Sequence, residues 1–217
     1  LRGTSFDNSY NIFLASMAYD RRLNARTSIG EIVSVQSTDY DGPGSVLVIT
    51  PQATARMSLS DNTDISGAVG VSFATVKNGL VTRRSTGLAF SGSLCHRGES
   101  DQLCASVARD QQTSTIAGPV STLSAGLTYS RRLDAKQTVQ LSASGSRYSA
   151  QDSGLGPLVV SGNSTYFNGG VAYTRQLGPR LSTGGNLSTR RLFRDGVDPK
   201  ADVSGSLFLR IRLGDRQ

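Results

Sequence analysis

Apolar and polar residues alternate along most of the sequence, the alternating segments are about ten residues long, and turn residues separate them at regular intervals. A period of two is the signature of a half-buried β-strand, and a tilted strand that crosses a bilayer needs about 9 to 11 residues. The sequence therefore predicts an all-β fold, an antiparallel up-and-down transmembrane β-barrel forming a single domain over residues 1–217. We expect about 11 strands in this chain and about 12 in the complete barrel, because bacterial single-chain barrels have even strand numbers.

The alternation is clearest between residues 122 and 132. Leu123, Leu127 and Tyr129 fall on one side of this segment, whereas Ser, Thr and Gly occupy the other. The same division recurs between residues 201 and 213. A soluble β-sandwich also alternates, but its exposed side would carry more Lys and Glu than the Ser, Thr, Gly, Asn and Gln found here. The polar side is therefore predicted to line a wet barrel interior.

Turn residues bound each alternating segment. The predicted strands are 10–22, 27–38, 53–60, 65–75, 85–95, 103–112, 122–132, 138–148, 165–176, 181–192 and 201–213. Short connections are expected at 23–26, 61–64, 97–102, 133–137 and 177–180, and longer ones at 39–52, 76–84, 113–121, 150–164 and 193–200. Transmembrane barrels typically have short periplasmic turns opposite longer extracellular loops, so this asymmetry is a second indication of the fold.

Composition and charge narrow the class further. The apolar run 46–49 is far shorter than the roughly 20 residues that a membrane-spanning helix needs, which excludes a helical membrane protein. With 24 Gly, no Trp and 37% hydrophobic residues, few bulky side chains remain for a globular core. The net charge of +7 fits either solubility and turn chemistry, or a basic lumen and basic rims that meet acidic lipid head groups.

The two cysteines, Cys95 and Cys104, flank a short polar stretch. If they oppose each other across a hairpin, alternation places both with Ser93 and Ser106, on the side away from Leu94. We predict a cross-strand disulfide that points into the lumen, because opposed residues come close enough for one and the periplasm is oxidising. The alternative is a pair of free thiols near a turn.

One motif closes three predicted strands. Tyr-Asp-Arg-Arg-Leu begins at Tyr19, Tyr-Ser-Arg-Arg-Leu at Tyr129 and Tyr-Thr-Arg-Gln-Leu at Tyr173. The three tyrosines are predicted to form an aromatic interface on the lipid side at one height, with the following arginines within reach of phosphates. Repeated hairpins of a soluble β-solenoid are the alternative, but a solenoid has one constant short period and this chain does not.

These strand ends, with the Asn-Ala-Arg-Thr and Asp-Ala-Lys-Gln-Thr turns that follow two of them, resemble Gram-negative outer-membrane β-barrels. They look similar to porin-like barrels found near exopolysaccharide and surface-polymer export systems. The resemblance implies a location in the bacterial outer membrane, in contact with the lipid bilayer and lipopolysaccharide. Because the strand count is odd and the chain ends Leu-Gly-Asp-Arg-Gln rather than in an aromatic strand, we expect a further strand from an upstream segment or another copy.

No enzymatic chemistry is expected. His96 is the only histidine, and a base needs a paired nucleophile or acid at one site. We interpret His96 as a solvated residue of a periplasmic turn. Asp39, Asp41 and Gly42 lack the spacing of a calcium loop and are interpreted as loop residues. The sequence thus predicts no catalytic, cofactor or metal site and no nucleic-acid partner.

The leading functional hypothesis is a channel or porin whose lumen is lined by Ser, Thr and Arg and favours anions. The predicted inward basic residues are Arg56, Arg132, Arg190, Arg210 and Arg212, against the acids Asp110 and Asp202.

Two alternatives remain at this stage. One is a structural or anchoring outer-membrane subunit of a larger envelope or export complex, including a homo-oligomer, in which the apolar segment 45–52 pairs with a partner by edge addition. The other is an autotransporter-like translocator. That function requires a helix ahead of the first strand, and residues 1–11 show no helical period.

Overall fold

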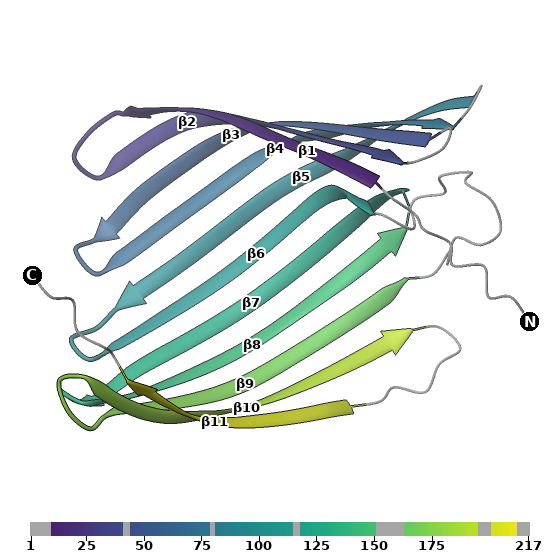
Figure 1. Ribbon diagram of the computed structural model, residues 1–217. Helices are drawn as coiled ribbons and strands as arrows, with labels where there is room; N and C mark the ends of the chain where they lie inside the picture. Colours follow the sequence, from purple (N-terminus) through teal and green to yellow (C-terminus); the bar gives the residue numbers. More distant parts are fainter. Residues whose placement is uncertain are drawn as a thin grey trace, which may run out of the picture.

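The chain forms one antiparallel sheet in which eleven strands follow one another in sequence order (Figure 1). The computed structural model describes residues 10–40, 44–78, 81–114, 118–150, 163–194 and 201–211. The strands are β1 (Tyr10–Arg22), β2 (Thr27–Tyr40), β3 (Gly44–Ser60), β4 (Thr63–Asn78), β5 (Val81–Arg97), β6 (Asp101–Ser114), β7 (Gly118–Asp134), β8 (Gln137–Ala150), β9 (Ser164–Gln176), β10 (Leu181–Arg194) and β11 (Ala201–Ile211). All the predicted strands are confirmed, except that residues 212–213 of the last one lie outside the described residues. Within the described ranges, no helix is long and apolar enough to cross a membrane.

The sheet has two chemically different faces, because successive side chains of a strand point to opposite sides. Residues that are directly paired on neighbouring strands lie on the same face of the sheet. Cys95 is paired with Cys104, and Cys104 with Thr128, so these three residues share a face, and the other pairs extend each face across the sheet. The polar face carries the even-numbered residues of every strand except β5, where it carries the odd-numbered ones. The apolar face carries all the others.

Large hydrophobic side chains of the apolar face are exposed instead of packed against a second layer. Val69 is 57% exposed, Leu127 48% and Leu187 53%, and at one edge Leu207 reaches 91%. A soluble β-sandwich buries its apolar face between two sheets, which is not the arrangement here. An exposed apolar face is what a barrel wall presents to lipid.

Three of the five connections predicted to be long are instead mostly strand. They are 39–52, 76–84 and 113–121, of which only 41–43, 79–80 and 115–117 lie outside the described residues. For the first two, the physical reason is a small apolar cluster, in which Val46 and Val48 of β3 are buried with Ala74 and Val76 of β4. Packing between these hairpins stabilises strand where Gly, Pro and Asp predict loop. Asp39 accordingly lies in β2, while Asp41 and Gly42 lie outside the described residues.

The segment 45–52 is not a free edge, so its predicted edge addition to a partner is wrong. It lies inside β3, which pairs with β2 on one side and β4 on the other. Pro51 within it has no N–H to donate, and the ladder between β3 and β4 is interrupted at Thr50 and Pro51. Gly70 of β4 lies opposite the next residue, Gln52, and a Cβ there would overlap the Pro51 carbonyl oxygen. Glycine is therefore required where the two backbones approach.

The end of β6 separates from β5, stays paired with β7 to Ser114, and bends over the polar face of the sheet. β5 and β6 pair only between Phe90–Arg97 and Gln102–Arg109, although both strands continue. Beyond that point Gln111 is buried, and its Nε2 donates a hydrogen bond to Ser85 Oγ of β5 at 3.3 Å. Figure 1 shows the corresponding ends of β1 to β5 drawn together beside the bent end of β6. The part of β6 beyond Arg109 therefore covers the polar face of the hairpins formed by β2 with β3 and by β4 with β5.

The curved sheet does not close on itself. β1 and β11 lie at its two edges, and because neighbours alternate in direction along an odd number of strands, both edges run the same way (Figure 1). Pairing them directly would create a parallel joint in an otherwise antiparallel wall. A second copy in the same membrane orientation would create such a joint at both edges. Closure with twelve strands stays a prediction.

Candidate functional site

Short hydroxyl side chains cover much of the polar face and hydrogen-bond to one another across strands. Ser66 Oγ of β4 and Ser93 Oγ of β5 are 2.7 Å apart, and Ser188 Oγ of β10 and Ser204 Oγ of β11 are 2.8 Å apart. Each pair satisfies part of its own hydrogen-bonding capacity without long side chains. The polar face is therefore wettable and leaves open space in front of it.

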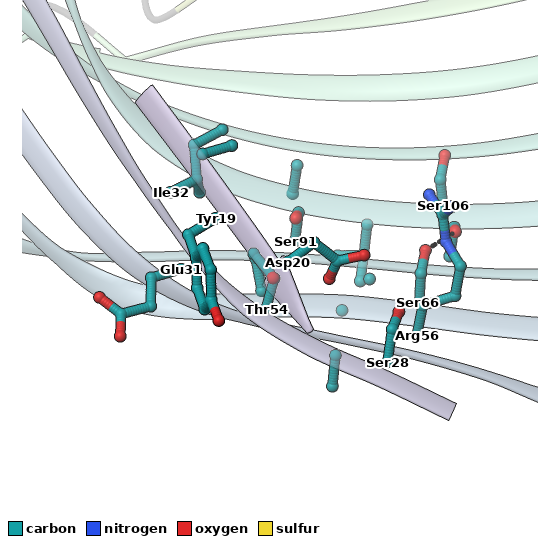
Figure 2. A pocket seen from close by; sticks show the side chains of 18 residues that line it. Tyr19, Asp20, Ser28, Glu31, Ile32, Thr54, Arg56, Ser66, Ser91 and Ser106 are labelled. Atoms are coloured by element: carbon teal, nitrogen blue, oxygen red, sulfur yellow. Dashed lines mark hydrogen bonds between the residues drawn. The ribbon is translucent and has the colours of Figure 1, made fainter. Parts of the chain in front are cut away.

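A hollow of about 490 Å³ lies against the polar face of β1 to β6. Figure 2 shows its charged residues Asp20 and Arg56 together with the hydroxyls of Ser28, Ser66 and Ser106. Alternation places small polar residues on one face of each strand. The register then brings these residues side by side on neighbouring strands. Glu31, on the rim of the hollow, belongs to the apolar face.

Four of the five basic residues predicted to point inward lie on the polar face: Arg56, Arg132, Arg190 and Arg210. Arg212 lies outside the described residues. The acids Asp110 and Asp202 share the same face. Further arginines on this face, which the sequence analysis did not single out, are Arg22, Arg83, Arg97 and Arg194. That these residues line a lumen stays a prediction.

Aromatic rings on the polar face hold two of these arginines in place. The Arg190 guanidinium lies 4.8 Å from the centre of the Tyr166 ring, and the Tyr148 ring meets Tyr166 edge-to-face at 5.4 Å. Arg210 lies 5.8 Å from the centre of the Phe208 ring. A cation over a ring face is attracted by the ring's quadrupole and needs no carboxylate. Within the described residues, Arg190 has no salt bridge, although Asp202 of β11 is its register partner.

The predicted disulfide is confirmed. Cys95 and Cys104 are bonded, with their Cα atoms 4.1 Å apart, and both lie on the polar face as expected. Neighbouring His96 lies in β5 instead of in a turn, which corrects the prediction, and its Nδ1 is 2.9 Å from Thr63 Oγ1. No group of three or more metal-ligating side chains occurs among the described residues.

The three tyrosines of the strand-end motif lie on the apolar face, as alternation predicts. Tyr19 is 65% exposed, and Tyr173 Oη donates a hydrogen bond to Gln137 Oε1 at 2.7 Å. Tyr173 thus combines an apolar ring with a satisfied hydroxyl, the combination that suits a membrane boundary. Their common height in a bilayer stays a prediction.

Comparison of the sequence with protein-family models and with curated proteins gives no match. Several solved structures are similar. The FrpB iron transporter from Neisseria meningitidis (F3-3 variant) matches with a TM-score of 0.68 and 11% identity over 86% of this chain. The likeness shows the fold. It is that of an antiparallel β-barrel wall, and the chain spans only 36% of the FrpB chain.

Another similar structure is the CymD monoaromatic hydrocarbon channel, with 8% identity over 94% of this chain and 86% of that chain. Its TM-score of 0.44 is too low to carry an argument.

Proposed function

We propose that this chain is a channel-forming wall in the outer membrane of a Gram-negative bacterium, with its polar face toward a water-filled lumen. The observation that carries this proposal is the exposed apolar face, which continues from β1 to β11 and is backed by a face of short hydroxyl side chains. Such a sheet has a stable environment only where lipid touches one side and water the other. The barrel fold of the FrpB structure supports it.

The lumen is proposed to favour anions. On the polar face, the arginines outnumber Asp20, Asp64, Asp110 and Asp202, and one of these acids, Asp64, already pairs with Arg97 at 3.4 Å. Rings of unpaired positive charge attract anions and repel cations at the walls of a pore. The Arg190 and Tyr166 pair places one such charge at a fixed position.

Planar-bilayer conductance in a potassium chloride gradient tests the proposal. We expect a reversal potential that reports anion preference, and we expect Arg190→Ala to move it toward zero. Arg191→Ala is the matched control, because Arg191 is the next residue but lies on the apolar face. A cation-selective pore, or an equal shift from both substitutions, would contradict the basic lumen.

A second candidate function is a wall segment within a larger envelope assembly. The open edges β1 and β11 favour it, because antiparallel closure needs an odd number of strands beyond these eleven. Cysteines introduced at Met17 and Leu207, one on each edge strand, distinguish the two cases. A cross-link within one chain indicates self-closure, whereas a cross-link to another polypeptide indicates an assembly. A link to exopolysaccharide export would be one version of this second candidate.

A further inference from the structure

Three of the arginines on the apolar face, away from the lumen, lie toward the same end of β6, β8 and β10. Other arginines on this face, Arg21, Arg84, Arg131 and Arg175, lie elsewhere on it. Arg109 of β6 and Arg147 of β8 both pair in register with Leu123 of β7, which lies between them. Arg191 of β10 pairs with Phe167 of β9. All three are exposed, and none forms a salt bridge with any residue of the described ranges. The apolar face therefore carries a group of uncompensated positive charges.

Aromatic rings accompany this group. The Arg191 guanidinium lies 4.8 Å from the centre of the Phe193 ring, and Phe193 meets Phe167 edge-to-face at 5.7 Å. The Phe167 ring lies over Gly145 of β8, where a Cβ would come within 3.1 Å of Phe167 Cε1. Gly145 thus leaves room for the ring on this face, two residues before Arg147. The two rings form an apolar platform with the Arg191 guanidinium at its border.

The height of Arg147 places it at a membrane boundary. Arg147 lies eight residues along β8 from Val139, which follows the short turn at 135–136. At about 3.3 Å per residue and a tilt of about 40°, this separation is about 20 Å across the membrane, close to the height of about 25 Å of a barrel's apolar band. An arginine at the centre of that band is unfavourable, but the cost nearly vanishes at its edges.

The end of the strands on which the group lies identifies the leaflet. β8 and β10 lead from Arg147 and Arg191 into the connections 151–163 and 195–200, whereas the turns at their other ends are 135–136 and 177–180. The remaining connections at this end, including 115–117 beyond Arg109, are as short as the opposite turns, so these two long connections identify the end. Longer connections face the outside of the cell in barrels of this kind. The arginines therefore face the outer leaflet.

We infer that Arg109, Arg147 and Arg191, with the platform of Phe167 and Phe193, form a docking site for a phosphorylated glycolipid of the outer leaflet, the lipid class of lipopolysaccharide. Guanidinium groups bind phosphate through paired hydrogen bonds, and the phenylalanine rings contact acyl chains beside the head group. This inference rests on the membrane location proposed above, but it does not depend on conduction through the lumen.

The test is binding of purified lipopolysaccharide to the full chain in detergent micelles. The variant Arg147→Ala/Arg191→Ala is compared with Arg132→Ala/Arg190→Ala, which removes the same charge from the polar face. Loss of charge-assisted hydrogen bonds to phosphate is expected to weaken binding by about tenfold or more in the first variant only. In wild type, enzymatically dephosphorylated lipopolysaccharide should bind as weakly, and inorganic phosphate alone should not bind measurably.

The outcomes separate the two proposals. Equal binding of phosphorylated and dephosphorylated lipid by the wild type, or equal losses in both variants, overturns the docking site and leaves the channel untouched. A chain that is monomeric and soluble without detergent overturns the membrane location and the docking site together. Inorganic phosphate that binds as tightly as the lipid overturns the lipid assignment, because the guanidinium groups would then be a general anion site.

Discussion

Arg190 and Arg191 are neighbours in β10, yet they lie in two different environments. Arg190 stacks on Tyr166, whose ring contacts Tyr148, all on the polar face. Arg191 stacks on Phe193, whose ring contacts Phe167, all on the apolar face. The two clusters have the same geometry, but the rings on one side carry hydroxyls and those on the other do not. The difference shows that the faces are matched to different solvents rather than to a shared protein core.

The middle of β8 extends this comparison. Ala143 and Leu141 on one face alternate with Ser142 and Ser144 on the other, and all four side chains are exposed. Exposure alone does not distinguish the faces. In the proposed wall, the two faces differ in the solvent that covers them, water on one and lipid on the other. Substitutions of adjacent residues test this difference.

The largest effect is expected from a charge placed in the apolar band. Ala143→Arg should lower the free energy of unfolding in lipid vesicles by about 2 to 4 kcal/mol, because an arginine at the bilayer midplane is poorly solvated. Ser144→Arg, one residue away on the polar face, is the matched control and should change it by less than about 0.5 kcal/mol. Denaturant titration in vesicles measures both. Equal effects would mean that the two faces meet the same solvent.

The disulfide on the polar face should have the next largest effect. Replacing both cysteines, as Cys95→Ser/Cys104→Ser, should lower the free energy of unfolding by about 2 to 3 kcal/mol, the loop-closure contribution expected for a separation of 9 residues. Serine is well solvated on this face, so no further loss is expected. The same titration with wild type under reducing conditions should give the same decrease. A much larger decrease in the serine variant would indicate that the cysteines face lipid.

Glycine substitutions compare the tightness of packing at two places. Gly70→Ala forces a Cβ against the Pro51 carbonyl oxygen, a backbone atom, and should cost about 1 to 3 kcal/mol. Gly145→Ala meets only the Phe167 ring, which can tilt, and should cost less than about 1 kcal/mol. Thermal unfolding of both variants measures the difference. A reversed order would contradict the close approach of β3 and β4.

The smallest effects are expected from exchanging ring types between the two arginine clusters. Tyr166→Phe removes a hydroxyl from the polar face, and Phe167→Tyr adds one near the edge of the apolar band. Both variants keep the ring, and each should change the free energy of unfolding by less than about 1 kcal/mol, because a tyrosine near a membrane boundary keeps its hydroxyl wet. A loss of several kcal/mol from Phe167→Tyr would place this position deeper in the apolar band.

Alternation predicted the strands, the two faces and the pairing of Cys95 with Cys104, because each follows from local period and a single hairpin. It did not predict that β3 begins at Gly44 or that Gln111 turns onto the polar face. Those features depend on contacts between distant segments, Val46 with Ala74 and Gln111 with Ser85. A local pattern of Gly, Pro and Asp cannot report such contacts.

The site was predictable to a similar extent. Alternation alone places Arg190 on the polar side, but its position over Tyr166 depends on the register that pairs Tyr166 with Leu192. The outward group around Arg191 went unrecognised, because arginine on a lipid-facing side runs against the expectation of an uninterrupted apolar row. Register between β8, β9 and β10 brings Gly145, Phe167 and Arg191 together, and the sequence does not state that register.

Cysteine accessibility along β8 tests the two-solvent account most directly. In a background with Cys95→Ser/Cys104→Ser, single cysteines at positions 139–147 are exposed to a charged, water-soluble maleimide with the protein in lipid vesicles. Positions 140, 142, 144 and 146 should be labelled, and 141, 143 and 145 should be protected. Uniform labelling, or protection of the even-numbered positions instead, would contradict a wall with lipid on one face and water on the other.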